Sequence, residues 1–295
     1  MKSIVYCARS AGLANRLRAL VGYQAMAQSL GVPFFLCWIP GPECDAEFGR
    51  LFLNLEGALI STDTLQRFVR HEDAVVYDQN VWFDKIWRDH ARETIRWEQF
   101  CGHVRVCLDQ LRPAPAIAEN ADGFVQRFGL ESSAGVHIRL TDNVKEYRHW
   151  ARHAPDFVPE HISEMGGFEN FIKDRLTENP SRQVFLATDN KQVERRMAGL
   201  FSDRIVTYPK RFKRGGMLLL SGMTSRSAPR RTSSVEDALI EMLILSRCRI
   251  TAGTYFSSFS KFSSILGTSD YMEVRGTGYA ESEFVSGIRR DLSGW

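Results

Sequence analysis

The chain has 295 residues, 44% of them hydrophobic and 25% charged, and its formal net charge at pH 7 is +3. This composition is typical of a globular protein with room for two domains, and it excludes a disordered, collagen-like or membrane-spanning chain. The charge is too small to indicate nucleic-acid binding by itself. Apolar runs such as residues 32–40 are shorter than a membrane helix needs, and the first residues lack the apolar stretch of a signal peptide, so we expect a cytoplasmic protein.

The first part of the chain predicts a strand, a helix and a second strand, which is how a parallel sheet begins. An apolar strand is predicted over residues 3–8. A helix with apolar residues at helical spacing follows from Leu13 and stops at Gly31, and the second strand covers residues 32–38.

Residues from about 43 to 125 are mostly helical by pattern, and from residue 131 onward strands and helices alternate. The predicted helices cover 84–102, 119–130, 168–177, 191–201, 236–248 and 257–267, and the predicted strands cover 134–140, 183–189, 204–209 and 249–253. This pattern predicts two doubly wound α/β halves divided near residue 128. The last 20 residues could cross back to the first half.

Three of the predicted strands in the second half end in polar residues, and in open parallel sheets ligands bind outside the carboxyl ends of the strands. His137 and Arg139 are two apart, so their side chains point to the same face. Asp189 follows the next strand, and Ser257 and Ser258 open the helix after a third. Each feature alone is common in helix caps or ion pairs. Three at equivalent strand ends predict a pocket for a nucleoside diphosphate, with Arg139 and the helix start binding phosphate.

The sequence narrows the chemistry of that pocket. It has no Gly-x-x-x-x-Gly-Lys motif, which argues against phosphoryl transfer by a P-loop, and no Gly-x-Gly-x-x-Gly after the first strand. It has no Asp-x-Asp pair, and its six cysteines form no Cys-x-x-Cys pair. His149 and His153 are four apart, but no third ligand accompanies them. We therefore expect no metal site and reduced cysteines, several of them in the core.

One segment has an uneven charge. Residues 210–231 hold seven basic residues and no acidic one. This segment is either a solvated loop or a flexible basic flap over an anionic ligand. Apart from Phe212 it lacks the aromatic residues that stack on RNA bases. We expect no nucleic-acid partner.

Taken together, these motifs resemble the GDP-fucose-dependent fucosyltransferase superfamily, which includes the bacterial nodulation α1,6-fucosyltransferases, the core α1,6-fucosyltransferases and the protein O-fucosyltransferases. The resemblance rests on the segments GLANRLRAL, W-x5-C-x-A-x-F-x-x-L-F (38–52), GVHIRLTDN, FLATDN, ALIEMLILS and TYFSSFS. It implies a GT-B fold, in which two Rossmann-like, doubly wound domains face a cleft. It also implies an inverting, metal-independent transferase with no cofactor beyond its donor substrate.

The resemblance implies an N-terminal acceptor-side domain over residues 1–128, a nucleotide-sugar-binding domain over 129–275 and a C-terminal segment over 276–295. In the second domain, Arg139 would hold the β-phosphate and act in catalysis, and His137 would contact the guanine or its ribose.

Further site residues follow from the same resemblance. Asp189 would lie near the nucleotide, and Glu241 would bind the guanine edge where the family usually has an aspartate. Ser257 and Ser258, next to Phe256, would hold the diphosphate.

In the first domain, Gly12 would belong to the loop near the nucleotide sugar. Asn15 would face the reaction centre, with the acceptor near Asn15 and Arg16. Glu146 is the candidate catalytic base, although it lies one place from the aligned position, which Tyr147 occupies.

The chain departs from the α1,6 enzymes at Leu140, where those enzymes have a second arginine. GDP-fucose is the expected donor and a glycan, peptide or small-molecule hydroxyl the expected acceptor. Three alternatives remain open: a transferase that uses another sugar nucleotide, a non-catalytic protein that binds a nucleotide or RNA, and an inactive relative of the enzymes.

Overall fold

The computed structural model describes residues 2–53, 55, 58–71, 74–139, 158–212, 233–267 and 269–294. Within these ranges the strands are β1 (Ser3–Ala8), β2 (Phe34–Trp38), β3 (Ala74–Tyr77), β4 (Ala134–Ile138), β5 (Val184–Thr188), β6 (Ile205–Val206), β7 (Ile250–Thr254), β8 (Asp270–Arg275) and β9 (Gly278–Glu281). The α-helices are α1 (Leu13–Leu30), α2 (Phe48–Leu51), α3 (Thr62–His71), α4 (Phe83–His90), α5 (Trp97–Gln110), α6 (Pro115–Phe128), α8 (Met165–Glu178), α9 (Lys191–Phe201), α10 (Val235–Arg247), α11 (Ser258–Leu266) and α12 (Glu283–Ser293). Short 3-10 turns cover Leu130–Ser132, Pro159–His161 and Ser202–Arg204.

The chain forms two compact units. The first contains residues 1–117 and 288–295, and the second contains residues 118–287. The division therefore falls within α6 rather than after residue 128, because α6 packs in the second unit, where the Phe124 ring lies 5.8 Å from that of Phe185. At the other end of the chain, Trp97 donates from Nε1 to Asp291 Oδ2 at 3.0 Å, a contact within the first unit.

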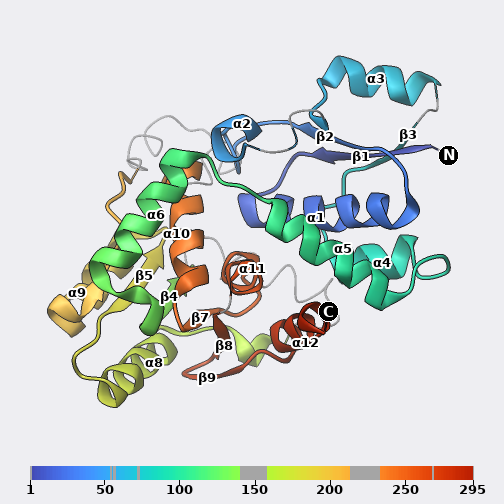
Figure 1. Cartoon of the computed structure of the whole chain (residues 1–295). Coiled ribbons are helices and arrows are strands. Elements are labelled where there is room, and N and C mark those ends of the chain that lie inside the picture. Colours follow the sequence, from blue (N-terminus) through green and yellow to red (C-terminus); the bar gives the residue numbers. More distant parts are fainter. Residues whose placement is uncertain are drawn as a thin grey trace. The chain divides into compact units, whose positions relative to one another are not determined.

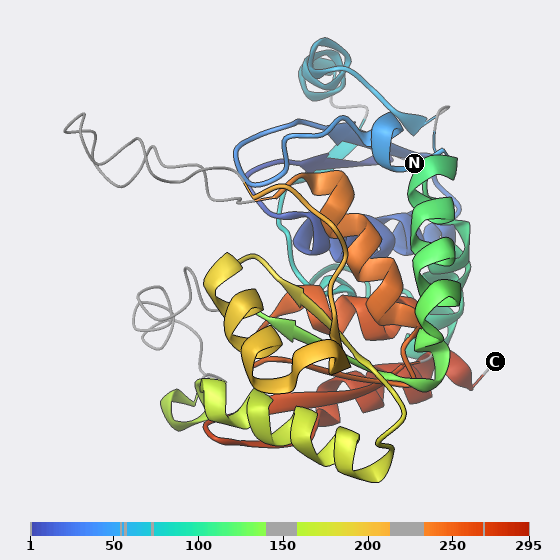
Figure 2. The same cartoon turned by 90° about the vertical axis from the view of Figure 1, so that its left-hand side faces the viewer.

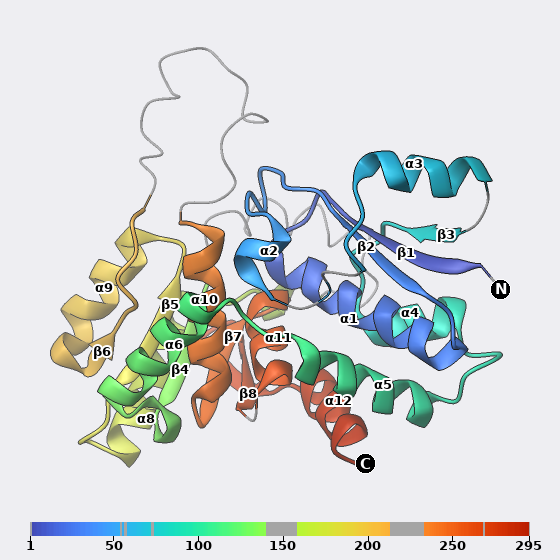
Figure 3. The same ribbon diagram turned by 45° about the horizontal axis from the view of Figure 1, so that its top comes forward.

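The first unit contains a parallel sheet with the strand order β2-β1-β3. Helix α1 covers one face of this sheet, where the Tyr23 ring lies 5.2 Å from Tyr6 and 4.7 Å from Tyr77. Helix α3 lies on the opposite side (Figure 3), and its Phe68 ring contacts Phe35 of β2 at 5.1 Å. As predicted, α1 ends at Gly31, whose φ of 64° lies in the left-handed region that glycine adopts most easily.

The middle of the first unit differs from the prediction at two points. The part predicted as mostly helical contains α2 to α6 and also the four-residue strand β3, whose Val75 and Val76 are exposed. The single helix predicted over 84–102 is two helices, α4 and α5. They are separated by a turn that Trp87 fixes by donating from Nε1 to the carbonyl of Ile95 at 2.8 Å.

The motif at residues 38–52 is a packing motif. Trp38 donates from Nε1 to the Ala46 carbonyl at 2.9 Å, and its ring meets Phe48 edge-on at 5.4 Å. Phe48 in turn lies 5.3 Å from Phe52. All the specified residues of this motif are buried, so they stabilise the loop after β2.

The second unit contains a sheet with the strand order β6-β5-β4-β7-β8-β9, parallel except for the β8–β9 pair. Helices cover both faces (Figures 1 and 2). Val136 and Ile138 of β4 pack in one core with Phe171 of α8 and Met197 of α9. Gly135, whose position alternates with theirs, faces Leu245 of α10. The doubly wound arrangement predicted for this half is therefore present.

The predicted strands of the second unit differ from the observed ones at the edges of the sheet. The strand predicted over 204–209 is only Ile205–Val206. Strands β8 and β9 were not predicted.

All six cysteines are free and buried, as expected for several of them. Among the described residues, no helix has both the length and the hydropathy needed to cross a membrane.

Candidate functional site

The strand order of the second unit reverses between β4 and β7. From β4 the chain moves outward through β5 to β6, and then returns to the other side of β4 with β7 and β8. Ligands of doubly wound proteins bind outside the carboxyl ends of the strands at such a reversal. His137 lies at the end of β4, and Thr254 is the last residue of β7. His137 therefore lies at the reversal of the strand order, where a ligand is expected.

His137 is held in a neutral form at this reversal. Its ring is 7% exposed and stacks on Phe259 of α11, with the ring centroids 4.6 Å apart. The Ser257 hydroxyl lies 3.4 Å from Nδ1. Burial, together with the positive charges of Arg139 and Lys210, lowers the pKa of His137 to about 3. At neutral pH one ring nitrogen therefore donates and the other accepts, which suits a ribose hydroxyl or a base.

Arg139 follows β4, and Thr254 fixes its backbone. The Thr254 hydroxyl donates to the His137 carbonyl at 3.3 Å and accepts from the Arg139 N–H at 2.9 Å. Thr254 thus joins the carboxyl ends of β4 and β7. The positive charge of Arg139 lowers the pKa of His137. These two predicted residues therefore lie near each other. No pattern in the sequence indicates this role of Thr254.

The turn from β7 to α11 presents the start of a helix beside His137. Phe256 has a φ of 61° and is 39% exposed. Ser257 precedes α11 but makes no side-chain capping bond, and the first turn holds no acidic residue. The N–H groups and the positive dipole end of such a helix start favour an anion. Ser257 and Ser258 are therefore placed where the sequence predicts phosphate binding.

Gly253 allows this turn to pack closely. It pairs in register with His137, and a Cβ atom there would lie 2.5 Å from the hydroxyl of Tyr271 and closer still to that of Ser260. We expect Gly253→Ala to lower the free energy of unfolding by about 1–3 kcal/mol through overpacking, measured by urea denaturation. The matched control is Gly199→Ala in α9, where a Cβ meets nothing within 4 Å. The control should stabilise the protein by about 0.5–1 kcal/mol, and equal effects of the two substitutions would contradict the packing described.

Asp189 lies one residue beyond β5 and is half-buried. The neighbouring Asn190, and not Asp189, caps α9, because its Oδ1 accepts from the N–H groups of Gln192 and Val193. The Thr188 hydroxyl donates to the Ile138 carbonyl at 2.8 Å, which ties the ends of β4 and β5 together. The simplest alternative to ligand binding for Asp189 is capping of α9, and Asn190 has that role instead.

Glu241 lies on α10 with its side chain buried, and Lys210, from the segment after β6, forms an ion pair with it. The side chains are 6% and 1% exposed. Burial raises the pKa of Glu241 to about 7, and Lys210 opposes that rise. Lys210 was missed as a site residue, although it is the first residue of the basic segment 210–231. The rest of that segment, from residue 213 onward, lies outside the described residues, as does residue 232.

The remaining candidates lie in the first unit. Gly12 precedes α1, and Asn15 is half-buried in its first turn. Arg16 is fully buried and donates to the carbonyls of Ala8, Ala11 and Ile39 at 2.7–3.1 Å. Its guanidinium therefore fixes the loops after β1 and β2.

Residues 140–157, which include Leu140, Glu146, Tyr147, His149 and His153, lie outside the described residues. In the described part of the chain, no three His, Cys, Asp or Glu side chains are grouped so as to hold a metal ion.

No protein-family model matches the chain, and no curated protein sequence matches it. Solved structures do. The fucosyltransferase NodZ from Bradyrhizobium is 17% identical, with a TM-score of 0.57 over 92% of this chain and 95% of that chain. POFUT1 in complex with GDP-fucose is 13% identical, with a TM-score of 0.53 over 95% and 98%. A mutant of Arabidopsis thaliana FUT1 in complex with GDP is 11% identical, with a TM-score of 0.53 over 92% and 70%. At these identities the likeness shows a shared fold, and it confirms the predicted α/β fold of GT-B type.

Proposed function

We propose that the protein is a glycosyltransferase that moves fucose from GDP-fucose to a hydroxyl group of an acceptor. The observation that supports this most is the meeting of His137, Arg139 and the start of α11 at the reversal of the sheet. The same fold occurs in structures solved with GDP or GDP-fucose. The absence of a P-loop motif from the chain also favours a donor held in this way over phosphoryl transfer.

In the proposed reaction the acceptor hydroxyl oxygen attacks the anomeric carbon of fucose while the bond from that carbon to the β-phosphate oxygen breaks. GDP leaves with the bonding electron pair, and the hydroxyl proton passes to a base. A single displacement of this kind inverts the anomeric centre and needs no metal if the protein stabilises the leaving diphosphate. Arg139 would do so with a bidentate contact, and the first N–H groups of α11 with their dipole.

The other proposed contacts follow from the same arrangement. The neutral ring of His137 would hydrogen-bond the ribose or the base without competing for the phosphate. Asp189 and Glu241 would contact the nucleoside, and Ser257, Ser258, Phe256 and Gly12 the rest of the donor. Asn15 would face the acceptor, and Glu146 is the proposed base.

The first test is binding of GDP, UDP and dTDP without added metal, measured by calorimetry on the full chain. We expect GDP to bind best, and Arg139→Ala to weaken GDP binding at least about tenfold, because the variant removes a charged, bidentate phosphate contact. Arg139→Lys should recover part of that loss, since it keeps the charge but not the planar donor pair.

The matched control is Arg195→Ala, the same change on an exposed residue of α9, which should leave GDP binding unchanged. If UDP or dTDP binds best, the donor is a different sugar nucleotide, and the fold assignment is unaffected. Failure of all three diphosphates to bind would reject the proposed function. Binding of GDP would be followed by turnover of GDP-fucose with candidate acceptors.

A further inference from the structure

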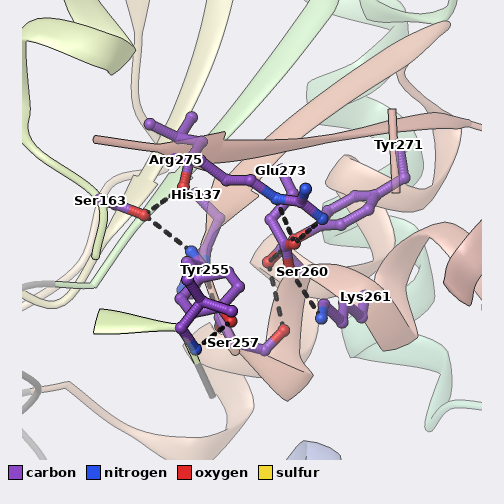
Figure 4. A network of polar contacts seen from close by, with 11 residues as sticks. His137, Ser163, Tyr255, Ser257, Ser260, Lys261, Tyr271, Glu273 and Arg275 are labelled. Atoms are coloured by element: carbon purple, nitrogen blue, oxygen red, sulfur yellow. Dashed lines mark hydrogen bonds and ion pairs between the residues drawn. The ribbon is translucent and has the colours of Figure 1, made fainter. Parts of the chain in front are cut away.

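A buried carboxylate lies between two cations beside the start of α11. Glu273 of β8 is 2% exposed, and its Oε1 is 2.7 Å from Nζ of Lys261 in α11. Its Oε2 accepts from Nε and Nη2 of Arg275 at 3.1 and 3.0 Å. Figure 4 shows the lysine and the arginine reaching the same carboxylate from α11 and from β8. We name these three residues the Glu273 cluster.

The lysine of this cluster also contacts the turn that precedes α11. Its Nζ lies over the Phe256 ring, 5.5 Å from the centroid, and 5.7 Å from that of Phe284. Phe256 has a left-handed backbone, which is unfavourable for a residue with a large side chain and persists only where the surroundings hold it. Tyr255 also restrains this ring, because the two rings meet edge-on with their centroids 4.7 Å apart.

The turn in which Phe256 lies determines where the helix start points. The N–H of Ser257 donates to the Thr254 carbonyl at 2.9 Å, and the Ser257 hydroxyl approaches His137. A change in the backbone of Phe256 would therefore move Ser257 and the first N–H groups of α11 together. Stability alone is a weak reason for a buried charge cluster, because apolar residues of similar volume usually replace such clusters without loss.

We propose that Lys261, held by the Glu273 cluster, is a positioning residue of the donor site. It fixes Phe256 in the left-handed turn and thereby presents Ser257 and the start of α11 to the diphosphate. This inference rests on the proposed function, because the diphosphate at this turn is part of it. It differs from a direct role in which the Lys261 charge itself attracts the phosphates.

Two variants with opposite charge changes separate these roles. Lys261→Met removes one positive charge, and Glu273→Gln removes one negative charge. If Lys261 positions the turn, both variants weaken GDP binding, Lys261→Met by about tenfold, because both release Phe256. If the charge acts directly on the diphosphate, Glu273→Gln tightens GDP binding and Lys261→Met weakens it. Lys261→Arg, which keeps the charge and the cation–π contact, should bind GDP within about threefold of the wild type.

A double-mutant cycle gives the decisive readout. In a Phe256→Ala background, Lys261→Met should change GDP binding by less than about twofold, because its effect passes through the ring that is already absent. The matched control is Lys173→Met, the same change on an exposed lysine of α8. Thermal unfolding of each variant identifies a loss that is only structural, in which Tm falls but the Kd for GDP does not change.

The outcomes distinguish this inference from the proposed function. A wild type that fails to bind GDP rejects both. A wild type that binds GDP, with Lys261→Met unchanged in Kd or with Glu273→Gln bound more tightly, rejects the positioning role alone. Equal effects of Lys261→Met with and without the Phe256 ring also reject it.

Discussion

Replacing Lys210 with methionine should lower the free energy of unfolding by about 1–2 kcal/mol at pH 8, because Glu241 then loses its cation and must take up a proton to stay buried. Both side chains of this ion pair are almost fully buried. Taking one partner of such a pair away exposes the full cost of burying the other charge, whereas the net contribution of the intact pair is small. Urea denaturation of the two proteins measures the difference.

The loss should depend on pH with a defined sign. Burial raises the pKa of Glu241 from its ordinary value of 4.5 to about 7, and Lys210 works against that rise, so the variant has a still higher pKa. A carboxyl group with a raised pKa in the folded state binds a proton there that the unfolded state releases. It therefore costs stability as the pH rises above 4.5 through the folded pKa. The loss caused by Lys210→Met should be largest at pH 8 and smaller at pH 5, where the folded carboxyl is neutral.

A matched pair on the surface provides the control. Lys85 and Asp89 form an ion pair of 2.8 Å on α4, but their side chains are 50% and 37% exposed. Lys85→Met should cost less than about 1 kcal/mol. The double variant Lys210→Met with Glu241→Gln should recover most of the stability, because it removes the carboxyl group that has lost its cation. Similar losses for Lys210→Met and Lys85→Met would contradict the buried ion pair.

The fold was largely predictable where the chain builds buried parallel strands between amphipathic helices. The segments around Val136, Leu186 and Ala252 are short apolar runs bounded by helical periodicity, and this pattern has few structural solutions. Prediction failed where the local signal is weak. β3 is a four-residue strand with exposed valines, and the break between α4 and α5 depends on a Trp87 contact that periodicity does not show.

The sequence could predict which residues belong to the candidate site, but not which other residues hold them in place. Parallel strands bring their carboxyl ends to one edge, so polar residues at or just after the strand ends, such as His137 and Asp189, could be grouped from sequence. The residues that contact the site residues from other elements could not be predicted in this way. Thr254 reaches the Arg139 backbone across 115 positions, and Lys210 reaches Glu241 from another element. These contacts depend on tertiary packing, which no spacing in the sequence encodes.

The second large expected effect is acid sensitivity that originates at His137. Burial and the charges of Arg139 and Lys210 lower its pKa from 6.5 to about 3. The unfolded chain takes up a proton at this residue below pH 6.5, and the folded chain does not, so stability is lost as the pH falls from 6.5 toward 3. The loss due to this residue should reach about 2 kcal/mol by pH 5.

The variant His137→Asn isolates that contribution, because asparagine is polar but does not titrate. All other ionisable groups are common to both proteins, so the difference in their free energies of unfolding reports on His137. That difference should shrink by about 2 kcal/mol between pH 7 and pH 5, as the wild type loses stability that the variant never had. A difference that stays constant over this range would mean that His137 titrates in the folded protein as it does in the unfolded chain, and a difference that grows would mean that it is already charged at pH 7. In either case the division of roles between Arg139 as the charged contact and His137 as the neutral, buried one would fail.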